Sequence, residues 1–540
     1  MATFVGVVDG NQRGKENEQR IAEAIKHELK QMLDYNVWTP TKRDKIPRDV
    51  KIIPSKMFTI EKYGPDGKYL KHKLRLVAGG HREWIPINLD TSSPTVRLET
   101  IYVALNLSAH YGFGIDTMDV GGAFLEADLR RDDVYVSLES KISSLLVELE
   151  RTYKEYVNHD GKIIVKLTKA LYGLKEASME WYQHLIKVLK EFGFEISKYD
   201  SAMLYKKQCG NKIVHIIVLH VDDMMSIGTK SSRDKLVDFL KRKFKKVTIN
   251  RDERTHQYVG LVIRKDNNGS IHISQPGLIK EITKEFGLDA ETASVTPCDE
   301  KLFTDKQDDD TLIPDPDKYR SHVMKMMYLT RSRPDIKLPI TYLSTKMQSP
   351  TRGDYVKLYK VAKYLNMTKS LELRFTPQQS MEVRCSADES FAVHKDAKGQ
   401  TGFCIWIGNQ NAPIHVQSKK QQLVTRSSTE AEMVALTSAG EEVLWIRGLL
   451  EELGFTKQPS TEIEQDNTSC ITLSNKGSGR AGRARAINVR YFWITDHIED
   501  GTFTLKHVPS EQLIADGFTK PMARDRFLKW RDRILNLEED

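Results

Sequence analysis

The chain has 540 residues, and at about 150 residues per domain it divides into roughly three or four folding units. Its 82 Lys and Arg against 74 Asp and Glu leave a net charge of +8, and 39% of the residues are hydrophobic. These values exclude a single compact domain and a wholly disordered chain. The small basic excess suits an ordinary basic protein as well as one that binds a negatively charged polymer.

Neither a membrane span nor a secretion signal is visible in the sequence. No apolar run reaches the ~18 residues that cross a bilayer, and the first residues do not form a basic stretch followed by an apolar one. The cysteines contain no CxxC pair, so we expect reduced thiols in an intracellular protein rather than disulfides or a zinc site. They are Cys209, Cys298, Cys385, Cys404 and Cys470.

Periodicity predicts the elements of the first half of the chain. A loose polar arm (1–20) leads into a helix over 18–35, and residues 56–80 form two strands around a turn at 64–67. The second of these strands alternates basic and apolar residues, which places Lys71, Lys73 and Arg75 on one face. We then expect a helix over 96–111, a strand and short helix over 112–129, a strand and helix over 163–192, a hairpin over 212–228, a basic helix over 232–247 and a hairpin over 254–275.

The second half begins with an acidic, irregular stretch, 298–317, which we interpret as a domain linker. Helical patterns follow over 318–370. The last third predicts strands and helices that form an α/β unit of its own, with a basic cluster over 476–490. Its elements are strands over 381–391, 402–408 and 413–420, a helix over 428–453, and strand candidates over 461–475 and 501–508.

Two adjacent carboxylates, Asp222 and Asp223, interrupt the apolar run of the hairpin over 212–228. Desolvating them without partners would be costly, so they need an exposed turn or a bound cation. Asp119, which ends a short apolar strand before two glycines, supplies a third carboxylate. Three such groups can hold two Mg²⁺ ions that activate a 3′-hydroxyl and stabilise a leaving pyrophosphate, although spacing alone leaves the exposed turn open as well.

Several motifs carry a family resemblance. KLRLVAGG, MDVGGAFLEADL, LYGLKEASMEWY and LHVDDMMSIG resemble the reverse transcriptase of Copia-type LTR retrotransposons, over about residues 30–290. Downstream, RSRPDI, SSTEAEMVAL, EQDNTSCITLSN and HVPSEQLIADGFTKPM resemble the connecting region and ribonuclease H domain that follow that polymerase. The chain is therefore similar to the C-terminal part of a retrotransposon polyprotein.

The resemblance implies an α+β multidomain fold, in which a right-hand polymerase of fingers, palm and thumb precedes an α/β ribonuclease H-like domain. The expected divisions are an N-terminal arm with the start of the first helix (1–30), the polymerase (31–290), a linker and connecting region (291–380) and the ribonuclease H-like domain (381–530).

The resemblance also assigns roles to residues of the polymerase. Asp119, Asp222 and Asp223 correspond to the metal-binding catalytic triad, with Asp119 and Asp222 as the direct ligands of both ions. Phe124 matches the bulky ring that excludes a ribose 2′-OH and so selects deoxynucleotides; without the family it would be a helix core residue. The remaining nucleotide-binding residues implied are Lys73 and Arg75 on the basic strand and Gly173 and Lys175 in the loop near the template base.

In the last third, four carboxylates match the ribonuclease H quartet of the family, which holds two Mg²⁺ ions against an RNA phosphodiester. Taken singly, each could be an ordinary surface carboxylate. They are Asp388, Glu432, Asp466 and Asp516. Each active site is thus expected to use two Mg²⁺ ions, with Mn²⁺ as the alternative.

The implied partners are an RNA template, a DNA primer, an RNA/DNA hybrid and dNTPs, with other pol and capsid products alongside and no membrane. The implied place is a cytoplasmic virus-like particle with access to the nucleus. The chain departs from the family pattern at Gly79, Ser178, His220 and Ala486, and two alternatives to an active polymerase stay open. One is a catalytically decayed, nucleic-acid-binding remnant, and the other is a metal-dependent nuclease without polymerase activity.

Overall fold

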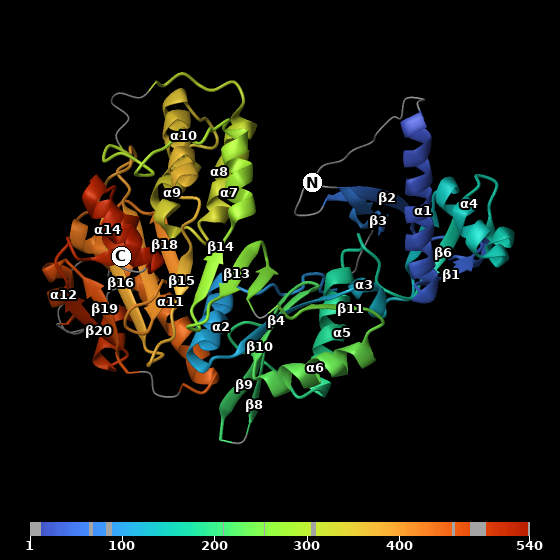
Figure 1. Ribbon diagram of the computed structural model, residues 1–540, viewed down its shortest axis with the longest axis horizontal. Helices are drawn as coiled ribbons and strands as arrows, with labels where there is room; N and C mark the ends of the chain where they lie inside the picture. The colour runs from blue at the N-terminus through green and yellow to red at the C-terminus, as the bar shows by residue number, and fades with distance from the viewer. Residues whose placement is uncertain are drawn as a thin grey trace.

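The computed structural model describes residues 12–63, 69–82, 89–208, 210–252, 254–303, 309–455, 459–475 and 493–537. Four β-sheets organise these residues, and helices pack on each sheet (Figure 1). The predicted α+β multidomain organisation is confirmed. None of the helices in these ranges has the length and apolar character needed to cross a membrane.

The N-terminal unit is built on a five-stranded sheet of order β1-β6-β5-β2-β3. Its elements are α1 (Gln12–Asp34), β1 (Trp38–Thr41), η1 (Arg43–Lys45), β2 (Ile52–Tyr63), β3 (Tyr69–Ala78), η2 (Gly80–Arg82), β5 (Tyr135–Leu138), α4 (Ser140–Leu149), η3 (Arg151–Tyr156) and β6 (Ile163–Leu167). The two strands predicted over 56–80 are β2 and β3, paired antiparallel. Helix α1 begins at Gln12, inside the segment predicted as a loose arm, so that prediction was wrong from this residue onward.

The central unit has an antiparallel six-stranded sheet of order β11-β4-β10-β9-β8-β7. Its elements are α2 (Leu98–Tyr111), β4 (Gly114–Val120), α3 (Ala123–Glu126), α5 (Ala177–Glu191), β7 (Glu195–Ile196), β8 (Met203–Gln208), β9 (Lys212–His220), β10 (Asp223–Gly228), α6 (Lys230–Lys243) and β11 (Val247–Asn250). Alternate residues of β9 enter two different hydrophobic cores: Ile216 and Val218 join one, Ile217 and Leu219 the other. Because side chains alternate along a strand, this sheet separates the two cores and is covered on both faces.

A four-stranded sheet of order β12-β13-β14-β15 follows, with the helices of the connecting region beside it. The elements are β12 (Thr255–Tyr258), β13 (Leu261–Lys265), β14 (Ile271–Ser274), α7 (Pro276–Glu285), α8 (Pro316–Leu329), η4 (Pro334–Ile336), α9 (Lys337–Ser344), α10 (Arg352–Met367) and β15 (Leu373–Phe375). The turn between β13 and β14 is closed by Asp266, whose Oδ1 accepts from the backbone N–H of Asn268 and of Ser270. Strand β15, from the predicted connecting region, pairs with β14, so the sheet crosses the boundary expected at residue 290.

The C-terminal unit has a five-stranded sheet of order β18-β17-β16-β19-β20, in which β16, β19 and β20 are parallel and the other pairs antiparallel. Its elements are β16 (Val383–Ser390), β17 (Gln400–Ile407), β18 (His415–Lys420), α11 (Ser428–Glu452), β19 (Thr461–Gln465), α12 (Thr468–Ser474), β20 (Phe503–His507), η6 (Ile514–Phe518) and α14 (Arg524–Leu535). The three strands predicted after residue 380 and the long helix are present. The basic cluster over 476–490 lies outside the described residues.

Two further predictions of elements were wrong in part. The basic helix expected to Val247 ends at Lys243, because Phe244 turns into extended backbone and is buried. Residues 468–474, expected as strand, form α12, because Asn467 caps a helix there by accepting from the backbone N–H of Cys470 at 3.0 Å.

The C-terminal unit packs directly on the central one through α11 (Figure 1). The Glu452 carboxylate accepts from Ser197 Oγ at 2.5 Å and from the backbone N–H of Lys198 at 2.9 Å. Arg97 forms an ion pair with Glu442 at 2.8 Å and lies 4.1 Å from the ring centroid of Trp445. A single hydrophobic core continues from α2 through the connecting helices into the C-terminal sheet, so the two units are joined by packing as well as by the chain.

Candidate active sites

The first carboxylate site, Asp119, Asp222 and Asp223, lies at one end of the central sheet. Strands β4 and β10 are antiparallel neighbours, and Asp119 is the register partner of Asp223. His220 pairs with Asp223 across β9 and β10, so Val221 and Asp222 form a two-residue turn. Opposed residues of antiparallel strands have Cα atoms about 4.5–5.5 Å apart, so the fold brings all three predicted carboxylates to one place. Asp119 and Asp223 are exposed, and Asp222 is half-buried.

This turn is held in an unusual backbone conformation. Val221 has φ 58°, which a β-branched residue rarely adopts. The fully buried Trp181, on α5, donates its indole N–H to the carbonyl of Val221 at 2.9 Å. Strained backbone of this kind persists only where the surroundings enforce it, and it is concentrated at functional sites.

Tyr172 joins the first carboxylate site to two of the predicted nucleotide-binding residues. Its ring centroid lies 4.7 Å from that of Phe124 and 4.6 Å from the guanidinium of Arg75. Burial raises the pKa of Tyr172 to about 12, Arg75 opposes the rise, and the carboxylates of Asp222 and Asp119 add to it. The phenol therefore stays protonated beside the aspartates. Sequence reasoning missed this residue, although it lies within the LYGLK motif.

Arg75 is itself positioned by the N-terminal helix. Glu28 on α1 accepts from the backbone N–H of Leu76 at 3.2 Å and lies 4.0 Å from the guanidinium of Arg75. The side chain of Lys73 lies outside the described residues, although its backbone, in β3, pairs with that of Ile60 in β2.

Gly173 lets the loop after β6 cross the end of β3. It has φ +90°, and a Cβ there would lie 2.2 Å from the carbonyl oxygen of Ala78. The backbone N–H of Ala78 donates to the carbonyl of Tyr172 at 2.7 Å, which fixes the crossing. Lys175, the other predicted residue of this loop, is exposed. The glycine thus sets the distance between the loop that carries Tyr172 and the strand that carries Arg75.

We expect Gly173→Ala to lower the free energy of unfolding by about 2 kcal/mol or more, because it adds a clash with Ala78 to the cost of positive φ. Urea unfolding measures this. Gly112→Ala is the matched control, because Gly112 has φ +68° and open space around its Cβ position. Equal losses in the two variants would contradict a role for the contact with Ala78.

The second carboxylate site, Asp388, Glu432, Asp466 and Asp516, lies in the C-terminal unit. Within the described part of the chain, Asp388, Glu432 and Asp466 form the only group of three potential metal ligands whose donor atoms all lie within 4.8 Å of one another. Asp388 comes from the middle of β16, Glu432 from the second turn of α11, and Asp466 follows the last residue of β19. Parallel pairing of β16 with β19 and the packing of α11 on β16 bring these three elements together.

Asp516, on η6, joins this group through a lysine. Lys520 Nζ lies 2.8 Å from Asp516 Oδ1 and 3.2 Å from Asp388 Oδ2, while Arg526 holds Asp516 Oδ2 at 2.7 Å. The predicted quartet therefore meets at one place, but its fourth carboxylate is compensated by two cations. Sequence reasoning missed Lys520 and Arg526, although Lys520 follows Asp516 at the i+4 spacing typical of paired charges.

Neighbouring groups orient the other three carboxylates. Gln465 donates from Nε2 to Glu432 at 2.9 Å, Ser510 donates to Asp466 at 2.6 Å, and Thr519 donates to Asp388. Burial and mutual repulsion raise the pKa values of Asp388 and Glu432. The adjacent Glu389 also has its pKa raised, to about 8, by burial and by Asp388.

These raised pKa values predict a pH dependence of stability. Without divalent ions, Glu389 and its neighbours hold protons in the folded state that the unfolded chain has already lost, so stability falls as pH rises from about 5 to about 8. Excess Mg²⁺ should flatten this slope, because cations compensate the ionised carboxylates. Thermal unfolding across this pH range, with EDTA and with Mg²⁺, measures both effects, and a metal-free stability that rises with pH would contradict the expectation.

The donor chemistry of both sites fits Mg²⁺. Each site offers several carboxylate oxygens, which are the ligands that this ion prefers. At the second site, the donor atoms of Asp388, Glu432 and Asp466 already lie close enough to bind one ion together.

Comparison with known proteins gives one family match. Residues 35–300 match the family described as Reverse transcriptase (RNA-dependent DNA polymerase). The chain is 29% identical over 493 residues to the Retrovirus-related Pol polyprotein from transposon RE1 of Arabidopsis thaliana, covering 90% of this chain and 32% of that protein. It is 27% identical over 481 residues to the corresponding polyprotein from transposon TNT 1-94 of Nicotiana tabacum, covering 87% and 34%.

The yeast Truncated transposon Ty1-A Gag-Pol polyprotein, from Saccharomyces cerevisiae, is 25% identical over 535 residues, covering 94% of this chain and 42% of that one. The chain thus spans about a third of the length of the plant relatives it matches. A solved foamy viral protease-reverse transcriptase in complex with RNA/DNA hybrid aligns with a TM-score of 0.49 at 13% identity, covering 93% of this chain and 54% of that chain.

Proposed function

Because this chain belongs to the Copia-type reverse transcriptases that carry a ribonuclease H-like domain, we propose that it copies RNA and DNA templates into DNA and degrades the RNA of the resulting hybrid. The two reactions serve retrotransposition and use the two carboxylate sites. The observation that carries the proposal is the register pairing of Asp119 with Asp223, with Asp222 in the turn between β9 and β10.

In the first reaction, Asp119 and Asp222 would hold two Mg²⁺ ions at the end of the central sheet, with Asp223 beside them. Mg²⁺, when bound, favours ionisation of a primer 3′-hydroxyl and neutralises the leaving pyrophosphate. The guanidinium of Arg75, which lies beside the ring of Tyr172, supplies a positive charge that orients the triphosphate of the incoming nucleotide. The packed rings of Phe124 and Tyr172 form the wall against which the deoxyribose lies.

In the second reaction, Asp388, Glu432 and Asp466 would hold one ion, and Asp388 with Asp516 a second, against an RNA phosphodiester. Thr519, Gln465 and Ser510 keep the carboxylates in place by hydrogen bonds. Lys520 bridges Asp388 and Asp516 and compensates their charge in the absence of an ion.

Primer extension on poly(rA)/oligo(dT) tests the proposed polymerase. We expect dTTP incorporation that needs Mg²⁺ and stops in EDTA. A protein that binds the primer-template but gives no metal-dependent product is the decayed remnant. A protein that degrades the hybrid and never extends the primer is a nuclease alone, and either result would overturn the polymerase proposal.

Phe124 gives a test of sugar selection. We expect Phe124→Val to raise the ratio of ribonucleotide to deoxynucleotide incorporation by about 10²-fold, because the smaller side chain leaves room for a 2′-OH. Competing rGTP and dGTP on a heteropolymeric template measures the ratio. Phe192→Val is the control. Phe192 is a partly buried residue at the C-terminal end of α5, and its substitution should leave the ratio unchanged.

A further inference from the structure

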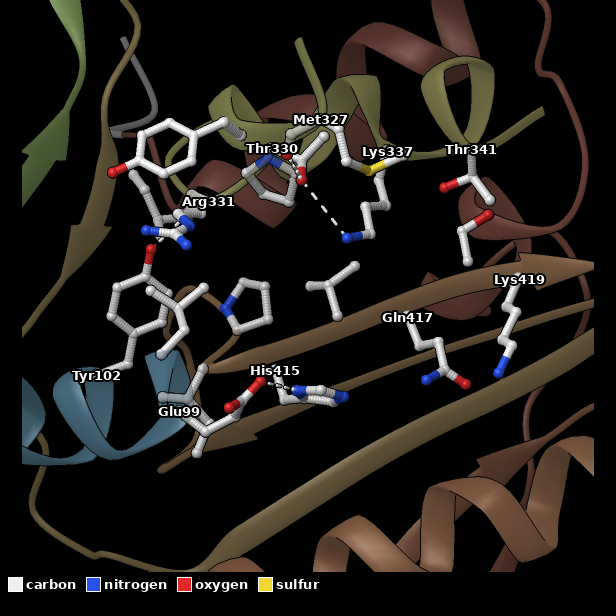
Figure 2. A pocket seen from close by; sticks show the side chains of 18 of the residues that line it. Glu99, Tyr102, Met327, Thr330, Arg331, Lys337, Thr341, His415, Gln417 and Lys419 are labelled. Carbon is white, nitrogen blue, oxygen red and sulfur yellow. Dashed lines mark hydrogen bonds and ion pairs between the residues drawn. The ribbon is translucent and has the colours of Figure 1, made fainter. Parts of the chain in front are cut away.

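A cavity of about 590 Å³ lies where the central unit, the connecting helices and the C-terminal sheet meet. Residues from α2, α8, α9 and β18 line it, together with Leu373 of β15 (Figure 2). Its volume falls within the ~300–1,000 Å³ typical of small-molecule sites. We call it the junction cavity. It is separate from both carboxylate sites, because none of their seven residues lines it.

Apolar side chains form much of the wall of the junction cavity. Leu98 comes from α2, Met327 from α8, and Ile414 from the residue before β18. The three surfaces are contributed by three different units of the fold, so a molecule seated between them would contact all three. An apolar body would remove these side chains from water at about 25 cal/mol per Å².

The wall of the junction cavity carries more positively charged than negatively charged side chains. Arg331, Lys337 and Lys419 line it, and among the described residues none of the three forms an ion pair. Arg331 instead lies over the ring of Tyr328, 4.1 Å from its centroid. The one carboxylate in the wall, Glu99, is already engaged: His415 Nδ1 lies 2.5 Å from it, and Arg97 lies 3.3 Å from it.

Lys337 is the cation that points into the junction cavity. Figure 2 shows its side chain extending from α9 toward the strand that carries His415 and Gln417. Among the described residues, the ammonium group of Lys337 donates one hydrogen bond, and it is a long one, 3.4 Å to Thr330 Oγ1; the remaining donor capacity is directed at the cavity. Burial lowers the pKa of Lys337; the carboxylate of Glu99 opposes this shift and Arg331 adds to it.

We propose that the junction cavity binds a small organic monoanion, an apolar body with a carboxylate or sulfonate group, whose charge is met by Lys337. A monoanion fits better than a nucleic-acid backbone, because the cavity is walled by apolar side chains from three units rather than open along a basic surface. Binding would tie the C-terminal unit to the central one and so stabilise their relative placement.

Two fluorescent probes that share one ring system test the proposal on the full chain. Anilinonaphthalene sulfonate carries the anionic group, and phenyl naphthylamine lacks it. We expect the sulfonate to bind at one site, and Lys337→Met to raise its Kd by about tenfold or more, since a charge-assisted hydrogen bond is lost. The Kd of the uncharged probe should change by less than about twofold, because Met keeps the apolar wall.

Two further variants keep the test decisive. Lys318→Met removes an exposed cation at the start of α8, outside the cavity, and should leave both probes unaffected. Thr341→Trp fills the cavity from α9 and should weaken both probes. Unchanged binding of the sulfonate in Lys337→Met, a loss in Lys318→Met as large as in Lys337→Met, or no binding to the wild-type chain would each overturn the proposal.

Discussion

Asp222→Asn should lower the rate of nucleotide incorporation by about 10³-fold or more, which corresponds to about 4 kcal/mol of transition-state stabilisation. Asp222 lies in the turn that brings it beside Asp119 and Asp223, and an amide cannot replace an ionised ligand of two cations. Single-turnover extension of a primed RNA template measures the rate. Hybrid cleavage should be unchanged, because the second carboxylate site lies in a different unit.

Two controls separate loss of chemistry from loss of fold in this experiment. Asp238→Asn, at an exposed position on α6, removes a carboxylate elsewhere in the same unit and should keep the wild-type rate. Fluorescence anisotropy should show that Asp222→Asn binds the primer-template as wild type does. Extension at more than a tenth of the wild-type rate would exclude Asp222 as a metal ligand.

Glu432→Gln should abolish hybrid cleavage and, at the same time, stabilise the metal-free protein. The pKa of Glu432 is raised by burial and by Asp388 and Glu389, so the folded state must retain a proton that the unfolded chain releases at neutral pH. A glutamine removes this cost and can still accept from Gln465. We expect a gain of about 1–2 kcal/mol in EDTA at neutral pH and a cleavage rate lower by about 10³-fold.

Glu441→Gln is the matched control for this variant, because Glu441 is an exposed residue of the same helix. It should change neither the cleavage rate nor the thermal midpoint. A Glu432→Gln protein that cleaves normally would remove this residue from the second site. One that is less stable in EDTA would show that the buried carboxyl forms contacts that favour folding.

The arrangement of the first site was predictable only in part from the residues. Asp222 and Asp223 are adjacent in the sequence and need no long-range contact to meet. Asp119 reaches them only through the pairing of β4 with β10, which joins residues more than a hundred positions apart. Such a pairing depends on the whole sheet, and the family motifs supplied it. Tyr172 was missed because its role comes from two contacts, with Phe124 and Arg75, that lie far apart in the sequence.

In the second half of the chain, too, local sequence patterns predict some elements, whereas others depend on contacts between distant residues. The strands and helix that carry Asp388 and Glu432 follow from periodicity, and Asn467 offered a capping signal for α12 that the strand interpretation overlooked. Strand β15 has three residues, too few for a period, and joins its sheet only through tertiary pairing. The bridge from Lys520 to Asp388 likewise exists only because η6 packs against β16.

The proposed function requires that one chain carry two separate metal-dependent sites. Its most direct test is a single reaction on an RNA template labelled at one end and annealed to a labelled DNA primer, run with wild type, Asp222→Asn, Glu432→Gln and the double variant. Wild type should extend the primer and cleave the RNA, Asp222→Asn should only cleave, Glu432→Gln should only extend, and the double variant should do neither. Loss of both activities in either single variant, or a wild-type chain without either activity, would contradict two separate metal-dependent sites.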